Sequence, residues 1–337
     1  MPPWMQNFAP HRFGPELPLV NAVRFLFQSA QIKKIQNIAG DPNAVPLPVH
    51  RNFPKIQQIH LTAKEVISEI APGISFNYWT YNEQVPGPMF RVRVGDVVQV
   101  SLTNDASSIH THNIDLHAVT GPGGGAALTN VEPGETKTFQ WKALNPGLYV
   151  YHCGTMNVST HNAHGQYGLI LVEPEEGLPD VDKEFYLMQG ELYTIGGTGK
   201  KGLVPFDSQN LVDGKPSYVT FNGKISSQNT MDVKRGDRVR IFVGNGGVNL
   251  ISSFHIIGEI FDTVYPEGAI GTGSTILKNV QTTLIPAGGS TIVEFVADVP
   301  GTYTIVDHAL ARINKGAWIE LRVTGEKNEE VFKKLDN

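Results

Sequence analysis

Only one cysteine, Cys153, occurs among the 337 residues, so an intrachain disulfide framework is excluded. No stretch approaches the roughly 20 consecutive apolar residues that a membrane-spanning helix requires. Long runs of one charge sign are also missing, since 27 Lys and Arg and 32 Asp and Glu leave a formal net charge of -5. Nucleic acid and anionic lipid are therefore not expected as partners. A lone thiol outside the cytoplasm is a liability unless another group holds it, so Cys153 needs a specific role.

Turn residues are abundant, with 35 Gly and 22 Pro in a chain that is 40% hydrophobic and 18% charged. This composition is typical of a soluble, turn-rich globular protein. Residues 90–104 alternate apolar and polar side chains around Gly95-Asp96, which is the period of strands with one buried face. The length favours two domains of about 150 residues each. The sequence therefore predicts an all-β, two-domain protein.

The second half of the chain carries a weak copy of the first. Residues 92–98 (VRVGDVV) match residues 233–239 (VKRGDRV), and residues 145–149 (NPGLY) match residues 299–303 (VPGTY). Similarity at domain length indicates a tandem duplication of one β-sandwich unit.

The seam between the copies is expected in the acidic, Pro- and Gly-bearing linker 174–183. The predicted organisation is an N-terminal arm over 1–54, a first domain over 55–173, a second domain over 184–326 and a C-terminal tail over 327–337. Within the arm, Leu17–Ile35 could form one amphipathic helix, and the arm is expected to pack on the body of the protein.

Seven of the eleven histidines lie in four short segments, a clustering that packing does not readily explain. Neighbouring side chains on a strand point to opposite faces, so His152 and Cys153 cannot easily bind the same ion. His112 and His117 likewise face opposite ways if their segment is extended. Two metal sites placed back to back are implied.

The first site would combine Cys153 with His112 and an imidazole from the following loop, where His161 lies. A trigonal site of two histidines and one cysteine selects copper and tunes it for electron transfer. The second site would combine His117 and His152 with a third histidine elsewhere. An all-imidazole site with an open position suits the binding and reduction of a small molecule.

A weak axial ligand completes such a copper site, and Gln166, five residues after His161, offers an amide oxygen there. Met156 is the competing candidate, but it lies too close to Cys153 for the usual axial place. His164, in the same loop, could contact the ligands without binding the metal itself.

The second copy has lost most of this chemistry. Its alignment places Asp307 where Cys153 stands and His255 where His112 stands, with His308 one residue after the lost cysteine. No second thiolate site is expected. A single histidine is more often a hydrogen-bonded or packed residue than a ligand, and this interpretation applies to His11, His50, His60 and His110.

These motifs resemble the two-domain copper nitrite reductases over about residues 55–325. The matching segments are 111–117 (THNIDLH), the Gly-rich 121–125, 146–153 (PGLYVYHC), 253–258 (SFHIIG) and Asp307-His308. The resemblance implies two Greek-key cupredoxin domains, a homotrimer and a dissimilatory, one-electron reduction of nitrite to nitric oxide. It also implies two coppers per chain, with an electron passing between them through the Cys153-His152 link.

The resemblance also assigns roles to single residues. It implies a type 1 copper on His112, Cys153 and His161, and a type 2 copper on His117, His152 and His308, with His308 reaching the type 2 site of a neighbouring subunit. Asp115 and His255 then flank the open position as proton carriers, and Ile257 shapes the pocket above the metal.

Two departures from the usual family pattern stand out. Gln166 takes the place of the common Met, and a harder oxygen donor should favour copper(II) and lower the potential of the type 1 site. Residues 260–262 (IFD) follow Gly258-Glu259 where better-known members carry another histidine, so the outer hydrogen-bond network is expected to differ.

The resemblance further implies a periplasmic location and an electron donor that is a small blue copper protein or a c-type cytochrome. The N-terminal residues contain no basic segment followed by an apolar core, so the sequence itself carries no sign of export.

Three other functions compete with this interpretation. A small laccase-type multicopper oxidase would need several His-x-His pairs and a His-Cys-His near the C-terminus, whereas Cys153 lies in the first half. A non-catalytic blue-copper electron carrier would leave Asp115, His117 and His308 unexplained. A purely structural β-sandwich with a buried thiol would be colourless.

Overall fold

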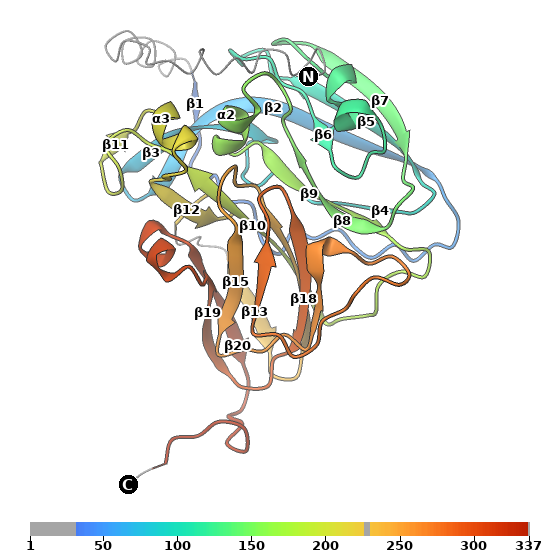
Figure 1. Ribbon diagram of the computed structural model, residues 1–337, viewed down its shortest axis with the longest axis vertical. Coiled ribbons are helices and arrows are strands. Elements are labelled where there is room, and N and C mark those ends of the chain that lie inside the picture. Colours follow the sequence, from blue (N-terminus) through green and yellow to red (C-terminus); the bar gives the residue numbers. More distant parts are fainter. Residues whose placement is uncertain (1–31, 226–229, 336–337) are drawn as a thin grey trace.

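The computed structural model describes residues 32–225 and 230–335, and Figure 1 shows their strands as two packed bodies. Four sheets form two β-sandwiches that follow one another along the chain. The all-β fold with two tandem cupredoxin-like units is therefore confirmed. None of the helices in these two ranges is long and apolar enough to cross a membrane.

The first sandwich pairs a six-stranded sheet, in the order β11-β3-β2-β5-β7 with β1 beside β2, and a four-stranded sheet, β4-β9-β8-β6. The first sheet contains β1 (Lys33–Lys34), β2 (Ile56–Ala71), β3 (Ile74–Tyr81), β5 (Val97–Asn104), β7 (Thr136–Lys142) and β11 (Gly202–Leu203). The second contains β4 (Phe90–Arg93), β6 (Asp115–Leu116), β8 (Gly147–His152) and β9 (Tyr167–Glu173). The short helices η3 (Pro122–Leu128) and α2 (Val158–Ala163) lie in its connections.

The second sandwich pairs two five-stranded sheets, β12-β10-β14-β18-β16 and β13-β20-β19-β15-β17. The first of these contains β10 (Lys183–Leu192), β12 (Tyr218–Phe221), β14 (Arg238–Asn245), β16 (Thr263–Tyr265) and β18 (Ser290–Val296). The other contains β13 (Met231–Lys234), β15 (Ser252–Ile257), β17 (Thr282–Ile285), β19 (Gly301–Asp307) and β20 (Trp318–Thr324). Its connections hold α3 (Ser208–Val212), η4 (Pro266–Gly268) and η5 (Leu310–Lys315).

The repeated Gly-Asp motif makes the same turn in both sandwiches. Gly95 and Gly236 have φ values of 90° and 93°, a region that glycine enters without steric cost. The carboxylates of Asp96 and Asp237 each accept a hydrogen bond from the backbone N–H three residues earlier, at 2.9 and 2.8 Å. Each turn joins a strand of one sheet to a strand of the other, which confirms the predicted duplication.

The strand register corrects one part of the sequence alignment. Asp115 lies opposite His152, the residue before the cysteine, and His255 lies opposite Val306, the residue before the replacing aspartate. His255 is therefore the structural equivalent of Asp115, and its alignment with His112 was wrong. In the two copies, different numbers of residues separate the paired positions, Asp115 and His152 in the first and His255 and Val306 in the second. Sequence alignment alone therefore did not give the correct register.

The described part of the N-terminal arm packs on the body, as expected. Residues 33–34 pair in parallel with β2, so the end of the predicted helix over 17–35 is a strand. The remainder of that helix lies outside the described residues. Further along the arm, the Val49 backbone N–H donates to Glu173 at 3.2 Å.

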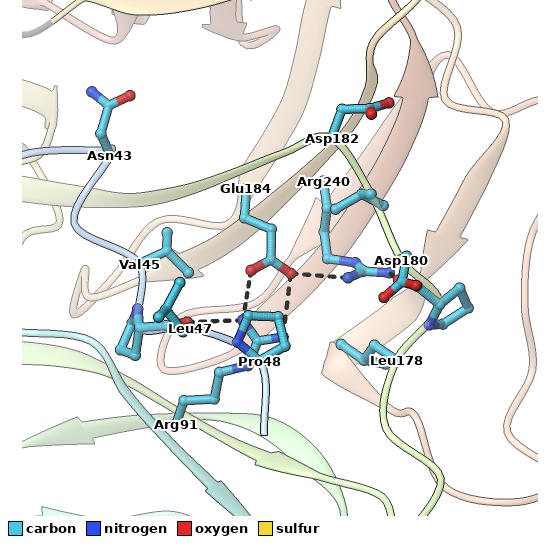
Figure 2. A pocket seen from close by; sticks show the side chains of 13 residues that line it. Asn43, Val45, Leu47, Pro48, Arg91, Leu178, Asp180, Asp182, Glu184 and Arg240 are labelled. Carbon is cyan, nitrogen blue, oxygen red and sulfur yellow. Dashed lines mark hydrogen bonds and ion pairs between the residues drawn. The ribbon is translucent and has the colours of Figure 1, made fainter. Parts of the chain in front are cut away.

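A buried ionic network joins the arm and both sandwiches (Figure 2). Glu184 accepts from Arg91 at 2.5 Å and from Arg240 at 2.9 Å, and its side chain is only 12% exposed. Arg91 also pairs with Glu173, and Arg240 with Glu294, whose side chains are buried. The Arg91 guanidinium donates further to the Pro46 carbonyl oxygen at 2.9 Å, at the edge of a cavity of about 280 Å³.

We expect Glu184→Gln to lower the free energy of unfolding by about 1.5–3 kcal/mol, because charge-assisted hydrogen bonds from Arg91 and Arg240 become weaker while Glu173 and Glu294 still pair with the two guanidinium groups. Denaturant unfolding measures the change. Glu175→Gln is the matched control, since the Glu175 side chain is 72% exposed and pairs with Arg93 only at 3.5 Å. Equal stability of the two variants would contradict a stabilising role for the network.

Candidate metal centres

Three metal-ligating side chains meet inside the first sandwich. The ligand atoms of His112, Cys153 and His161 all lie within 4.8 Å of one another, and all three residues are buried. Cys153 follows the end of β8, His161 belongs to α2, and His112 pairs with Val131 in an isolated bridge. The Cys153 Sγ atom is 3.3 Å from Nδ1 of His161. The structure therefore brings together the three predicted equatorial ligands.

Gln166, the predicted axial ligand, lies beside the three equatorial ligands. Gln166 is fully buried, and its Oε1 atom lies 3.3 Å from Nδ1 of His161. The competing Met156 is 41% exposed. His164 instead stacks on Trp79, with ring centroids 4.2 Å apart, and its Nδ1 lies 2.7 Å from the Thr160 carbonyl oxygen.

The electrostatics of this cluster suit a metal that prefers thiolate and imidazole. Burial raises the pKa of the Cys153 thiol, but interactions with His112, Thr155 and the Asn113 N–H outweigh it and lower the pKa overall. Burial lowers the pKa of His161 to about 4, so its imidazole is neutral at pH 7. Nδ1 of His112 is buried and has no hydrogen-bond partner among the described residues. This donor set of one thiol and two imidazoles, one of which has a buried nitrogen without a hydrogen-bond partner among the described residues, fits copper.

A second cluster lies on the opposite side of the same strand end. The ligand atoms of Asp115, His117 and His152 also lie within 4.8 Å of one another. The Nε2 atoms of His117 and His152 are 3.0 Å apart, and Nδ1 of His152 is 2.9 Å from the Cys153 carbonyl oxygen. Desolvation and the neighbouring His152 lower the pKa of His117 to about 4, so its lone pair is available at neutral pH. The Nε2 atoms of His117 and His152 fit a metal site that keeps a coordination position open for a small molecule.

Asp115 owes its position to the Gly-rich stretch. Gly124 has a φ of 55°, and a Cβ atom there would lie 1.9 Å from Oδ1 of Asp115. Only glycine leaves room for the carboxyl group at this point. Desolvation raises the pKa of Asp115, against an opposing effect of His152.

His255 and His308 lie together in the second sandwich. Their ring centroids are 5.2 Å apart, and Nδ1 of His255 lies 2.6 Å from the Gln281 carbonyl oxygen. Neither residue belongs to a cluster of potential metal ligands within the described ranges. One chain therefore supplies two of the three imidazoles predicted for the second site, and His308 is exposed.

Asp307, at the position equivalent to the cysteine, has a purely structural environment. It is fully buried, and its carboxylate accepts from Arg312 at 2.5 Å and from the Ser253 backbone N–H at 3.1 Å. The position that holds the thiol in the first copy therefore holds an ion-paired carboxylate in the second.

Sequence reasoning missed two residues of the first cluster. The carboxylate of Glu65 is 3.2 Å from Nε2 of His112 and 3.0 Å from Nδ1 of His110. Burial raises the pKa of Glu65, but the two histidines outweigh it and hold the pKa well below its usual range. Trp79 lies edge-on to His161, with ring centroids 4.6 Å apart.

A signal for Glu65 was present in the strand pattern. The buried positions of β2 include Ile59, Leu61 and Ala63, so Glu65 has the inward parity of the strand. A carboxylate on the core-facing side of a strand needs a partner, because burial of an unpaired charge is costly. Trp79 carries no comparable signal, since a buried aromatic residue is ordinary in a strand.

The chain is similar to known copper proteins along most of its length. Residues 63–177 and 204–327 both match families described as multicopper oxidase. The copper-containing nitrite reductase of Neisseria meningitidis serogroup B is 50% identical over 308 residues, which are 90% of this chain and 78% of that protein. That of Neisseria gonorrhoeae is 52% identical over 292 residues, 86% of this chain and 74% of that protein. The solved copper nitrite reductase from Nitrosomonas europaea has a TM-score of 0.72 at 33% identity, over 82% of this chain and 96% of that chain.

We expect Gln166→Met to raise the reduction potential of the copper predicted at Cys153, because a thioether stabilises copper(I) better than an amide oxygen does. A redox titration followed by visible absorption measures the shift. Gln140→Met, on the exposed part of β7, is the control and should leave the potential unchanged. An unchanged potential in Gln166→Met would show that Gln166 is not the axial ligand.

Proposed function

Because the chain belongs to the copper-containing nitrite reductases and is an oxidoreductase, we propose that it reduces nitrite to nitric oxide at a type 2 copper fed by a type 1 copper. The observation that carries this proposal is the back-to-back placement of the two clusters. Cys153 belongs to one cluster and His152 to the other, so a single peptide bond joins them.

The ligands divide between the two coppers. His112, Cys153 and His161, together with Gln166, would hold the type 1 copper, and His117 and His152 would hold the type 2 copper. Copper supplies one-electron redox chemistry and Lewis acidity toward the nitrite anion. The peptide link between Cys153 and His152 provides the covalent connection for the electron.

Protons come from the residues around the open position. Nitrite takes up one electron and two protons and loses one oxygen as water to give nitric oxide. Asp115 lies within 4.8 Å of the type 2 ligand atoms and can donate a hydrogen bond to a bound nitrite oxygen when it is protonated. His255 relays the second proton from solvent, and its ring supports this role by lying 5.2 Å, centroid to centroid, from the ring of His308, the third proposed ligand of the type 2 copper.

The working assembly is a homotrimer in which His308 of one subunit completes the type 2 site of the next. The exposure of His308 and the two-imidazole cluster of the single chain support this assembly. We place the enzyme in the periplasm, in denitrification, with a small blue copper protein or a c-type cytochrome as electron donor.

The domain division is also proposed. The first cupredoxin domain covers 55–173 and the second 184–326, with the arm 1–54, the linker 174–183 and the tail 327–337 around them. The end of β9 at residue 173 and the start of β10 at residue 183 support the two ends of the linker to within a residue, whereas β11, at residues 202–203, pairs with β3 of the first sandwich.

An anaerobic assay of nitric oxide formation from nitrite, on copper-loaded protein, tests the proposed function. We expect nitrite-dependent nitric oxide and EPR signals of two copper types in equal amounts. Copper-loaded protein that reduces no nitrite, or that binds a single copper per chain and acts only as an electron carrier, would contradict the proposal.

We expect Asp115→Asn and His255→Ala to keep both coppers but to lower turnover by about 10²-fold or more, the usual contribution of a positioned acid or base. Metal analysis and steady-state rates measure the two effects. Asp213→Asn and His60→Ala are the controls, because both side chains lie outside the two clusters. Full turnover in either Asp115→Asn or His255→Ala would remove that residue from the mechanism.

A mixing experiment tests the shared site. We expect His308→Ala and His117→Ala to be inactive separately, each with a normal type 1 signal. Trimers assembled from an equal mixture should regain about one quarter of the active sites, since random mixing pairs an intact His117 with an intact His308 at that frequency. If His308 served its own chain, mixed trimers would stay inactive.

A further inference from the structure

Glu65 makes a dense set of hydrogen bonds beside the type 1 cluster. It lies on β2 and is 3% exposed. Its carboxylate accepts from the backbone N–H groups of Ile109 and His110 at 3.1 Å each. The same group faces Nδ1 of His110 at 3.0 Å and Nε2 of His112 at 3.2 Å. One buried carboxylate thus binds both the backbone of residues 109–110 and the imidazole ring of His112, a predicted ligand of the type 1 copper.

The contact with His112 decides which ring nitrogen can bind metal. A carboxylate can only accept, so Nε2 of His112 must carry the proton that points at Glu65. The neutral ring then has its lone pair on Nδ1, the atom that has no partner among the described residues. One ring nitrogen of His112 belongs to the cluster with Cys153 and His161, and because Nε2 is directed at Glu65 we assign that place to Nδ1.

We propose that Glu65 is a positioning residue of the type 1 site, which fixes the tautomer and orientation of His112 and increases the basicity of its Nδ1 atom. A hydrogen bond from a ligand imidazole to a carboxylate has both effects in metal sites. A more basic ligand stabilises copper(II) relative to copper(I), so Glu65 lowers the reduction potential. This role rests on the proposed type 1 site.

His110 hydrogen-bonds to the same carboxylate, so a substitution of His110 provides a second test of the proposal. Its ring stacks on Trp79, with centroids 4.1 Å apart, and its Nδ1 hydrogen-bonds to Glu65. Without the His110 donor, the Glu65 carboxylate is a stronger hydrogen-bond acceptor for Nε2 of His112. His110→Phe keeps an aromatic ring on Trp79 and removes the hydrogen bond.

The test measures the copper affinity and the reduction potential of Glu65→Gln in the full-length protein. Gln is neutral and similar in shape, and it keeps an oxygen that can accept from the loop. We expect an about 10- to 100-fold weaker binding of copper at the type 1 site. We also expect a higher potential, where each tenfold loss of preference for copper(II) corresponds to about 59 mV. Glu69→Gln is the matched control on the same strand, because within the described part of the chain Glu69 accepts a hydrogen bond only from the Gly73 N–H, at 3.0 Å.

A purely structural role of Glu65 would lower thermal stability without moving the potential or the EPR signal of the folded protein. That result, or a shift no larger than in Glu69→Gln, would overturn the proposal. If Glu65→Gln does not fold, His110→Phe decides alone: a lowered potential supports the proposal, and an unchanged or raised one overturns it. Unmodified protein without a type 1 signal would overturn the proposed copper site and, with it, this role of Glu65.

Discussion

The alternation of side chains at the end of β8 is the constraint on which both candidate metal centres depend. Successive residues of a strand point to opposite faces, so His152 and Cys153 enter different clusters although one peptide bond joins them. The Cys153 carbonyl oxygen also lies 2.9 Å from Nδ1 of His152, which leaves Nε2 of that ring for the second cluster. A change of one residue in register would exchange the two faces and remove both sites together.

The duplicated fold explains how one chain carries two kinds of functional residue. The first sandwich keeps the thiol and the clustered imidazoles, whereas the second has an aspartate in place of the thiol, neutralised by Arg312. His255 occupies in the second copy the place of Asp115 in the first. The proposed proton carriers are thus equivalent positions of two diverged repeats, and the exposed His308 is the residue through which the second copy is proposed to reach a neighbouring subunit.

Sequence patterns predicted the local features well, because strand alternation and turn chemistry depend on neighbouring residues. The Gly-Asp turns, the two sandwiches and the grouping of Cys153 with His161 all follow from such patterns. The contact between Glu65 and His112 does not, because a strand that precedes the histidine segment brings the carboxylate to the ring. The equivalent of His255 was also misplaced, since only hydrogen-bond register reveals it. The sequence alone therefore did not predict which residues of distant strands lie opposite or in contact with one another.

The central claim is that the Cys153-His152 link connects two working coppers. Rapid one-electron reduction of the copper-loaded protein, followed by visible absorption, tests it directly. The account predicts that the band of the type 1 copper first bleaches and then partly recovers as the electron moves to the type 2 copper. In His117→Ala, which lacks a ligand of the receiving site, the bleached band should persist. A band that stays bleached in the intact protein with both coppers bound would contradict the account.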